Sequence, residues 1–134
     1  MADPVGTFAA LKNQRLLVEE GDTHFMVERN FLIALMAKLI ANVKFDENWY
    51  LAKYPDVKEA VKRGIVASGR EHYLRSGYYE HRMPTAILVD EKWYLEAYPD
   101  VAKAIKVGTY KTGQAHFDIA GFREGRMPYA NFEL

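Results

Sequence analysis

The stretch NWYLAKYPDV at residues 48–57 returns as KWYLEAYPDV at residues 92–101, 44 positions further along the chain. The match continues without a gap between residues 45–84 and residues 89–128. Identical residues fall throughout, from Asp46 and Asp90 at the start to Pro84 and Pro128 at the end. Two copies of one supersecondary unit explain this self-similarity better than chance does.

Each copy carries residues that begin and end short helices. In the first copy, Asp46 stands at an N-cap position, and Pro55 cannot continue a helix but suits the first turn of the next one. Gly64 provides a left-handed stop, Ser68 opens a capping box, and Gly77 ends the third helix. The second copy has residues of the same roles 44 positions later, which predicts about three short helices and no strand in each unit.

The predicted fold is therefore all-α, with everything folded together as one compact domain. We expect an N-terminal segment with a long apolar helix at 1–44, a first repeat at 45–88, and a second repeat with a C-terminal tail at 89–134. A chain of 134 residues with 49% apolar content can bury a core without disulfides or metals. Cysteine is absent, which excludes disulfides and thiolate nucleophiles.

The segment 11–30 fits two different structures. It can form a short hairpin around Glu20-Gly21-Asp22, or a helix can begin after Asp22. We favour the helix, starting at about Thr23 and running into the apolar segment 31–43.

The apolar residues of the 31–43 helix spread over more than one narrow stripe, so this helix needs cover on two sides. The repeats can cover one side. Phe31, Leu35 and Leu39 are candidates for a face that binds a protein partner or a second copy of the chain. The alternative is that the helix is the central core element.

Several classes of function are not favoured. Eighteen basic and eighteen acidic side chains leave no net charge to attract nucleic acid. The segment 31–43 is too short for a transmembrane helix, and residues 1–14 lack a signal-peptide pattern, so we expect a cytoplasmic protein. The histidines lack metal-ligand spacing, and no cofactor or metal is predicted.

The aromatic pairs Trp49/Trp93 and Tyr50/Tyr94 are interpreted first as core residues, because large aromatics repeated in two copies usually pack within and between the copies. The alternative is that these aromatic side chains are exposed and form a cleft in which their faces stack on sugar rings. Arg82 and Arg126 would complete that ligand cleft, although we expect them to pair with Asp56 and Asp100 in a structural network. An enzyme would need His72, Glu80, His81 and Arg82 to converge, which nothing in the sequence requires.

The pattern Asp, aromatic-Tyr-Leu, Tyr-Pro-Asp-Val, Ala, Gly, His-Tyr, Gly, Glu-Gly-Arg, Pro resembles a short repeat of bacterial proteins. That repeat occurs in proteins linked to envelope polysaccharides, including glycosyltransferases, and in secreted calcium-binding repeat proteins. The resemblance covers residues 45–128. The calcium nonapeptides and the glycosyltransferase catalytic domains do not occur here. His81 stands where the second copy has Gly125, so we expect the first exit turn to differ in backbone conformation.

These patterns predict a non-catalytic protein-interaction or scaffold module, bacterial and cytoplasmic, associated with surface-polysaccharide synthesis by the resemblance of its repeat. The alternative is a small-ligand or glycan-binding protein that uses the aromatic cleft between the repeats.

Overall fold

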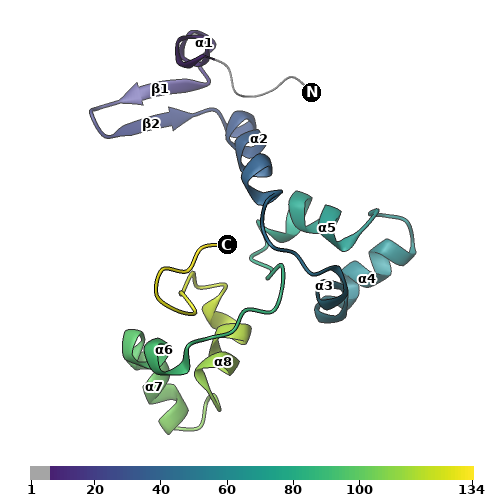
Figure 1. Ribbon diagram of the computed structural model, residues 1–134. Helices are drawn as coiled ribbons and strands as arrows, with labels where there is room; N and C mark the ends of the chain where they lie inside the picture. The colour runs from purple at the N-terminus through teal and green to yellow at the C-terminus, as the bar shows by residue number, and fades with distance from the viewer. Residues whose placement is uncertain (1–6) are drawn as a thin grey trace. The chain divides into compact units, whose positions relative to one another are not determined.

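The structure is a computed structural model that describes residues 7–134, and these residues are predominantly helical (Figure 1). The chain divides into two compact units, Met1–Val43 and Lys44–Leu134, hereafter unit 1 and unit 2. This confirms the predicted helical class and its two similar groups of short helices. The folding of both units together as one domain stays a prediction.

Unit 1 contains helix α1 (Phe8–Asn13), strands β1 (Leu17–Glu20) and β2 (His24–Val27), and helix α2 (Arg29–Ile40). The two strands pair antiparallel, with Leu17 opposite Val27 and Glu20 opposite His24. Gly21 takes a left-handed φ of 65° in the connecting turn. The hairpin alternative is therefore correct, and the favoured helix from Thr23 is wrong.

Helix α2 begins later than predicted because a carboxylate at the end of the hairpin caps it. The Glu28 side chain accepts hydrogen bonds from the amides of Asn30 and Phe31, at 3.0 and 2.8 Å. These amides would otherwise lack partners at the helix start. The helix ends at Ile40, three residues before the predicted end at Val43.

Unit 2 consists of the two repeats, and the described residues in it form no strand. The first repeat contains helices α3 (Glu47–Lys53), α4 (Pro55–Lys62) and α5 (Gly69–His72), and α5 continues as a π-helical turn, η1 (Tyr73–Gly77). The second contains α6 (Glu91–Ala97), α7 (Pro99–Lys106), α8 (Gly113–His116) and η2 (Phe117–Gly121). Figure 1 shows α6, α7 and α8 packed as one compact group.

The predicted helix signals are confirmed in both repeats. Asp46 caps the Trp49 amide, Ser68 caps the Glu71 amide, and Pro55 occupies the first turn of α4. Gly64 has a left-handed φ of 70° after α4. The capping box differs in one detail, because the Glu71 carboxylate accepts from the Ala67 amide and not from that of Ser68.

A second carboxylate also caps α5, from a distant part of the sequence. Glu47 Oε1 and Oε2 accept hydrogen bonds from the amides of Gly69 and Arg70, at 2.6 and 3.0 Å. Glu91 binds the amides of Gly113 and Gln114 in the second repeat. The carboxylate stabilises the positive end of a very short helix and fixes it against the first helix of its repeat.

The core of each repeat is built around a fully buried tyrosine on the first helix of the repeat. Tyr50 contacts Tyr54 and Tyr73, with ring centroids 4.8 and 5.9 Å apart. Tyr94 repeats these contacts with Tyr98 and Phe117, at 4.8 and 6.0 Å. Aromatic core packing, the first interpretation of these residues, is what the structure shows for both tyrosines.

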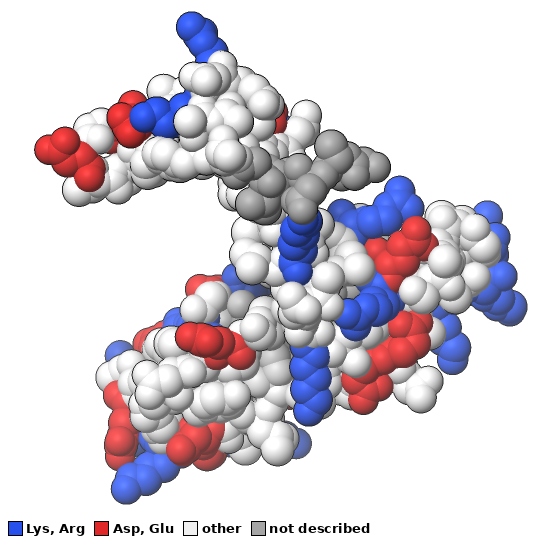
Figure 2. Space-filling model, turned by 45° about the horizontal axis from the view of Figure 1, so that its top comes forward, with Lys and Arg blue, Asp and Glu red and all other residues white. Residues whose placement is uncertain are grey.

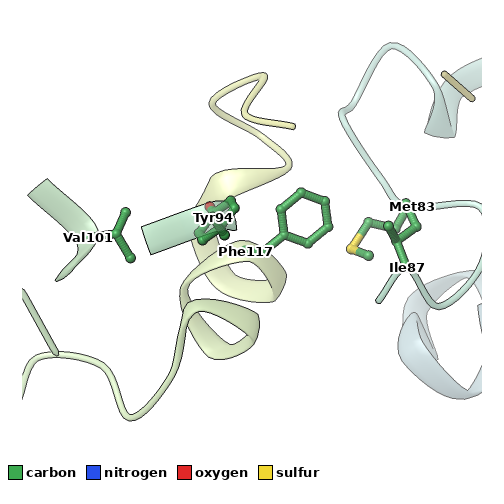
Figure 3. Close-up of a cluster of buried hydrophobic side chains, with 5 residues drawn as sticks. All are labelled: Met83, Ile87, Tyr94, Val101 and Phe117. Carbon is green, nitrogen blue, oxygen red and sulfur yellow. The ribbon is translucent and has the colours of Figure 1, made fainter. Parts of the chain in front are cut away.

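The segment that leaves the first repeat packs onto the core of the second. Figure 3 shows the Phe117 ring with Tyr94 on one side and Met83 and Ile87 on the other. Gln114 holds this segment by donating to the Ile87 carbonyl and accepting from the Val89 amide, at 2.9 and 2.8 Å. The two repeats are therefore joined by apolar burial and by side-chain hydrogen bonds to the connecting backbone.

The two exit turns share one backbone conformation. His81 has a φ of 59° and Gly125 has a φ of 75°, both left-handed. The predicted difference between the turns is wrong, because the bond from the Arg82 amide to the Gly77 carbonyl, 2.9 Å, recurs between Arg126 and Gly121. A residue with a Cβ is thus held in a conformation that favours glycine.

Replacing Gly77 by alanine should strongly destabilise the protein. A Cβ at Gly77 would overlap with Tyr50 Oη, and a Cβ at Gly121 would overlap with Tyr94 Oη. Such overpacking costs about 1–3 kcal/mol or more. We expect Gly77→Ala and Gly121→Ala to lower the free energy of unfolding in urea by similar amounts, while Ser76→Ala, one position away, changes it little. Wild-type stability of Gly77→Ala would contradict this packing.

Candidate functional site

Each repeat has an arginine clamp at its exit turn. Arg82 donates two hydrogen bonds to Asp56, at 2.9 and 2.7 Å, and a third to Glu80, at 2.7 Å. The guanidinium also lies over the Tyr54 ring, 4.9 Å from its centroid. Arg126 repeats the set with Asp100, Glu124 and Tyr98. The predicted pairing of Arg82 with Asp56 and of Arg126 with Asp100 is confirmed.

The clamp alters the acid–base behaviour of its members. Hydrogen bonds from Arg126 lower the pKa of Asp100 to about 2, and Arg82 likewise lowers the pKa of Asp56. The pKa values of both arginines are raised by their carboxylate partners. All four groups therefore stay charged near neutral pH and act as fixed ion pairs.

The two equivalent histidines are held by the buried tyrosines. His72 Nδ1 lies 3.0 Å from Tyr50 Oη, and His116 Nδ1 lies 2.9 Å from Tyr94 Oη. Burial lowers the pKa of both histidines and raises that of Tyr94 to about 12. Near neutral pH, an uncharged histidine and an uncharged tyrosine share each hydrogen bond.

The residues of the enzyme alternative occupy different settings. Glu80 and Arg82 are joined in the clamp, His72 bonds to Tyr50, and His81 is exposed. Across the described part of the chain, no group of three or more His, Asp and Glu side chains is arranged to hold a metal ion. Within residues 7–134, no helix is both long and apolar enough to cross a membrane.

Two cavities lie along the seam between the repeats. The first, hereafter the polar cavity, has a volume of about 370 Å³. Its walls combine basic, acidic and aromatic side chains from both repeats: Lys53, Tyr54, Glu80, His81, Arg82, Met83, Asp118, Ile119, Phe122 and Arg123. Lys53 and His81 have no counterpart of the same type in the second copy, where Ala97 and Gly125 stand.

The second cavity, hereafter the aromatic cavity, has a volume of about 380 Å³. It is lined by Tyr73, Tyr78, Tyr79, His81, Arg82, Phe122, Gly125, Arg126, Met127, Phe132 and Leu134. His81, Arg82 and Phe122 border both cavities. The left-handed residue that replaces a glycine thus stands where the two cavities meet.

Tyr73 borders the aromatic cavity and carries an unsatisfied polar group that is buried away from it. Its side chain is 1% exposed, and its hydroxyl is buried with no hydrogen-bond partner. Burial raises its pKa to about 12, so it remains a neutral donor. The second repeat has Phe117 at this position, equally buried and without a hydroxyl.

The predicted ligand residues lie apart from the two cavities described above, except for the arginines. Tyr50 and Tyr94 are fully buried, which leaves them no exposed face for a sugar. Trp49 and Trp93 are half-buried and pack against the shared core. Arg82 and Arg126 line the aromatic cavity but are held in their clamps. A ligand role for the tryptophans stays a prediction.

The candidate interface residues of α2 differ in exposure. Phe31 is 6% exposed, Leu35 is half-buried, and Leu39 is 65% exposed. Their role in association also stays a prediction.

The sequence reasoning missed Tyr73, Tyr78 and Phe122 as site residues. A signal for Tyr73 was present, because the copies differ at this core position by a single hydroxyl. The same Tyr-to-Phe difference separates Tyr78 from its equivalent Phe122, but these two residues become cavity walls only when the repeats pack together.

Comparison with protein-family models, with curated proteins and with solved structures found no match for this chain. The duplicated helical unit is therefore established by its own internal contacts, which recur in both repeats.

Tyr50 and Tyr73, the two fully buried tyrosines of the first repeat, should respond oppositely to loss of their hydroxyls. Tyr73→Phe removes an unpaired buried group, so we expect the free energy of unfolding to rise by about 1 kcal/mol. Tyr50→Phe removes a hydrogen bond to His72 and should lower it by about 1 kcal/mol. Urea denaturation of both variants tests this, and a destabilised Tyr73→Phe would show that the hydroxyl has a partner.

Stability should fall as the solution is acidified from about pH 7 to 5. The folded pKa values of His72 and His116 lie below the ordinary value of 6.5, so the unfolded chain takes up these protons first. Protonation then favours unfolding. Urea denaturation across this range measures the effect. Greater stability at pH 5 than at pH 7 would contradict the lowered pKa values of His72 and His116.

Proposed function

We propose that the protein is a non-catalytic interaction module that associates with a second copy of itself through unit 1. The observation that carries this proposal is the small amount of core in unit 1. Among residues 7–43, only Phe31 and Ile40 are buried. The exposed large apolar side chains there are Phe8, Val18, Phe25, Met26, Leu32, Ile33 and Leu39.

The hairpin adds a second reason for association. A two-stranded sheet leaves one edge of each strand without backbone partners, and isolated hairpins are marginally stable in water. In a symmetric dimer, the hairpin edge of one copy would pair with the same edge of the other, and the exposed apolar side chains of both copies would be buried. Such an interface uses the same surface on each copy.

Charge also favours a second copy over a strongly charged partner. The basic residues described in unit 1 are equal in number to the acidic ones: Lys12, Arg15, Arg29 and Lys38 against Glu19, Glu20, Asp22 and Glu28. Two such surfaces do not repel each other. Figure 2 shows blue and red side chains interspersed on the visible face, without a continuous region of either sign.

The non-catalytic character rests on the use of the polar groups in unit 2. The arginine clamp and the tyrosine–histidine pair occur twice in nearly the same geometry. Groups repeated in this way, and bonded to one another, support each repeat as structure. A catalytic acid–base centre would instead be expected at a single position, with side chains that are not already bonded to one another.

The resemblance of the repeat supports one extension of this proposal, to a cytoplasmic module associated with bacterial surface-polysaccharide synthesis. A pull-down with the tagged protein tests it. Enzymes of envelope polysaccharides should be enriched over a control bait, and their absence among the enriched proteins would count against the extension.

A charged residue at Leu39 should abolish self-association. Leu39 is 65% exposed, so Leu39→Glu should leave the fold intact, whereas Leu35 is half-buried. Light scattering coupled to gel filtration should give a dimer mass for the wild type and a monomer mass for Leu39→Glu, with circular dichroism unchanged.

The matched control is Leu88→Glu, which alters an 80% exposed leucine between the repeats and should remain dimeric. A wild-type monomer, or a folded Leu39→Glu variant that keeps the wild-type mass, would overturn the proposal.

A further inference from the structure

The pairing within the hairpin determines which of its backbone groups face outward. The Glu28 amide donates to the Leu16 carbonyl at 3.0 Å, and this pair continues the register of β1 with β2. In an antiparallel ladder, hydrogen-bonded pairs alternate with pairs whose N–H and C=O groups point away from the partner strand. Met26 therefore bonds to β1, whereas the N–H and C=O groups of Phe25 and Val27 point outward along the β2 edge.

The other edge of the hairpin, along β1, has features that protect a sheet from further pairing. β1 contains Glu19 and Glu20, and charged side chains on an edge strand discourage the addition of another strand. Helix α1 lies against β1, where Lys12 bonds to Glu19 at 3.1 Å (Figure 1). β1 is therefore a poor partner for an added strand.

The β2 edge lacks these features in its own sequence. Its residues, His24–Val27, include no lysine, arginine, aspartate, glutamate or proline. Phe25 is 49% exposed and Met26 is 53% exposed. An exposed, uncharged edge with outward backbone groups is a template for another strand.

The two faces of the hairpin also differ. Phe25 lies on the face that meets α1, where its ring contacts Phe8 edge-on with centroids 6.0 Å apart. Val18 and Met26 stand opposite each other on the other face, because side chains alternate along a strand. They are 37% and 53% exposed. A sheet widened beside β2 would bury more of this face.

The β2 strand of a second copy fits this edge. In an antiparallel pair related by a two-fold axis, residues that stand opposite each other lie on the same face of the sheet. Placing Phe25 opposite Val27 of the second copy meets this condition, uses the outward groups of both residues, and keeps the turn out of the pairing. The two Met26 side chains then meet at the axis. The acidic β1 strands form the two outer edges, which disfavours the addition of further strands.

We propose that the β2 strands of two copies pair antiparallel along these edges and form one four-stranded sheet. This inference rests on the proposed self-association through unit 1, and it adds the strand, the register and the backbone bonds that hold the copies together. Each pair of Phe25 with Val27 exchanges both of its N–H···O=C bonds. The mode of recognition is strand addition, with a second copy of the chain as the partner.

Amide hydrogen exchange in the wild-type protein, followed by NMR, tests the pairing directly. Phe25 and Glu19 stand opposite each other in the hairpin, and the amides of both point outward. We expect the Phe25 and Val27 amides to exchange at least about tenfold more slowly than the Glu19 amide. Equal exchange of Phe25 and Glu19 in a dimer, or protection of Glu19 alone, would overturn the edge pairing and leave self-association standing. A monomeric wild type would overturn both.

Proline variants separate the backbone bonds from the side chains. Phe25→Pro removes an outward amide that the hairpin itself does not use, so the strand can still form. Gel filtration with light scattering should give a monomer mass for Phe25→Pro and a dimer mass for Phe25→Ala, which loses the same ring but keeps the amide. Glu19→Pro, on the opposite edge, should stay dimeric. A dimeric Phe25→Pro would overturn the pairing. The exchange measurement uses the wild type, so it decides the question even where a variant fails to fold.

Discussion

The burial of one tyrosine in the middle of each repeat is the constraint on which unit 2 depends. Its helices have between four and eight residues, too few to be stable alone in water. Tyr50 fills the space between them, contacts the rings of Tyr54 and Tyr73, and reaches His72 with its hydroxyl. Gly77 has no side chain because that hydroxyl occupies the space. Local caps start the helices, but the tyrosine determines how they meet.

A repeated sequence gives unequal surfaces once the copies are joined in one chain. Met83 follows the first clamp and is 3% exposed, because it packs in the core of the second repeat beside Phe117. Met127 has the same place after the second clamp, and it is 37% exposed. The two methionines make the same local hydrogen bond. The Met83 amide donates to the Tyr54 hydroxyl and the Met127 amide to the Tyr98 hydroxyl, each at 2.8 Å. The seam is therefore a property of the pair of repeats and exists in neither repeat alone.

Much of unit 2 could be predicted because its signals act over short distances. These signals depend on residue chemistry at fixed spacing. They are the caps at Asp46 and Ser68, the proline at the start of α4, and the pairing of Arg82 with Asp56. Each of them occurs again in the second repeat. The choice in unit 1 was harder. Thr23 could begin a helix as readily as Gly21 could form a turn, and the pairing of β1 with β2 decided between them.

The exit turn and the cavities show the limit of local rules. A histidine in place of glycine suggests a different turn, yet backbone hydrogen bonding holds His81 at the glycine conformation. The aromatic cavity requires residues from both repeats and from the C-terminal tail. Neither its volume nor the isolation of the Tyr73 hydroxyl can be read from a single copy of the repeat.

The internal duplication also provides a control for judging which features serve folding. At two positions the first copy carries the residue that costs more: a hydroxyl without a partner at Tyr73, and a side chain in a left-handed conformation at His81. The second copy has Phe117 and Gly125, which avoid both costs in the same fold. Both costly residues line the same cavity. Of these two, only His81 departs from the repeat pattern, in which His-Tyr and Glu-Gly-Arg occur, so the first copy keeps the tyrosine of the pattern and has exchanged its glycine.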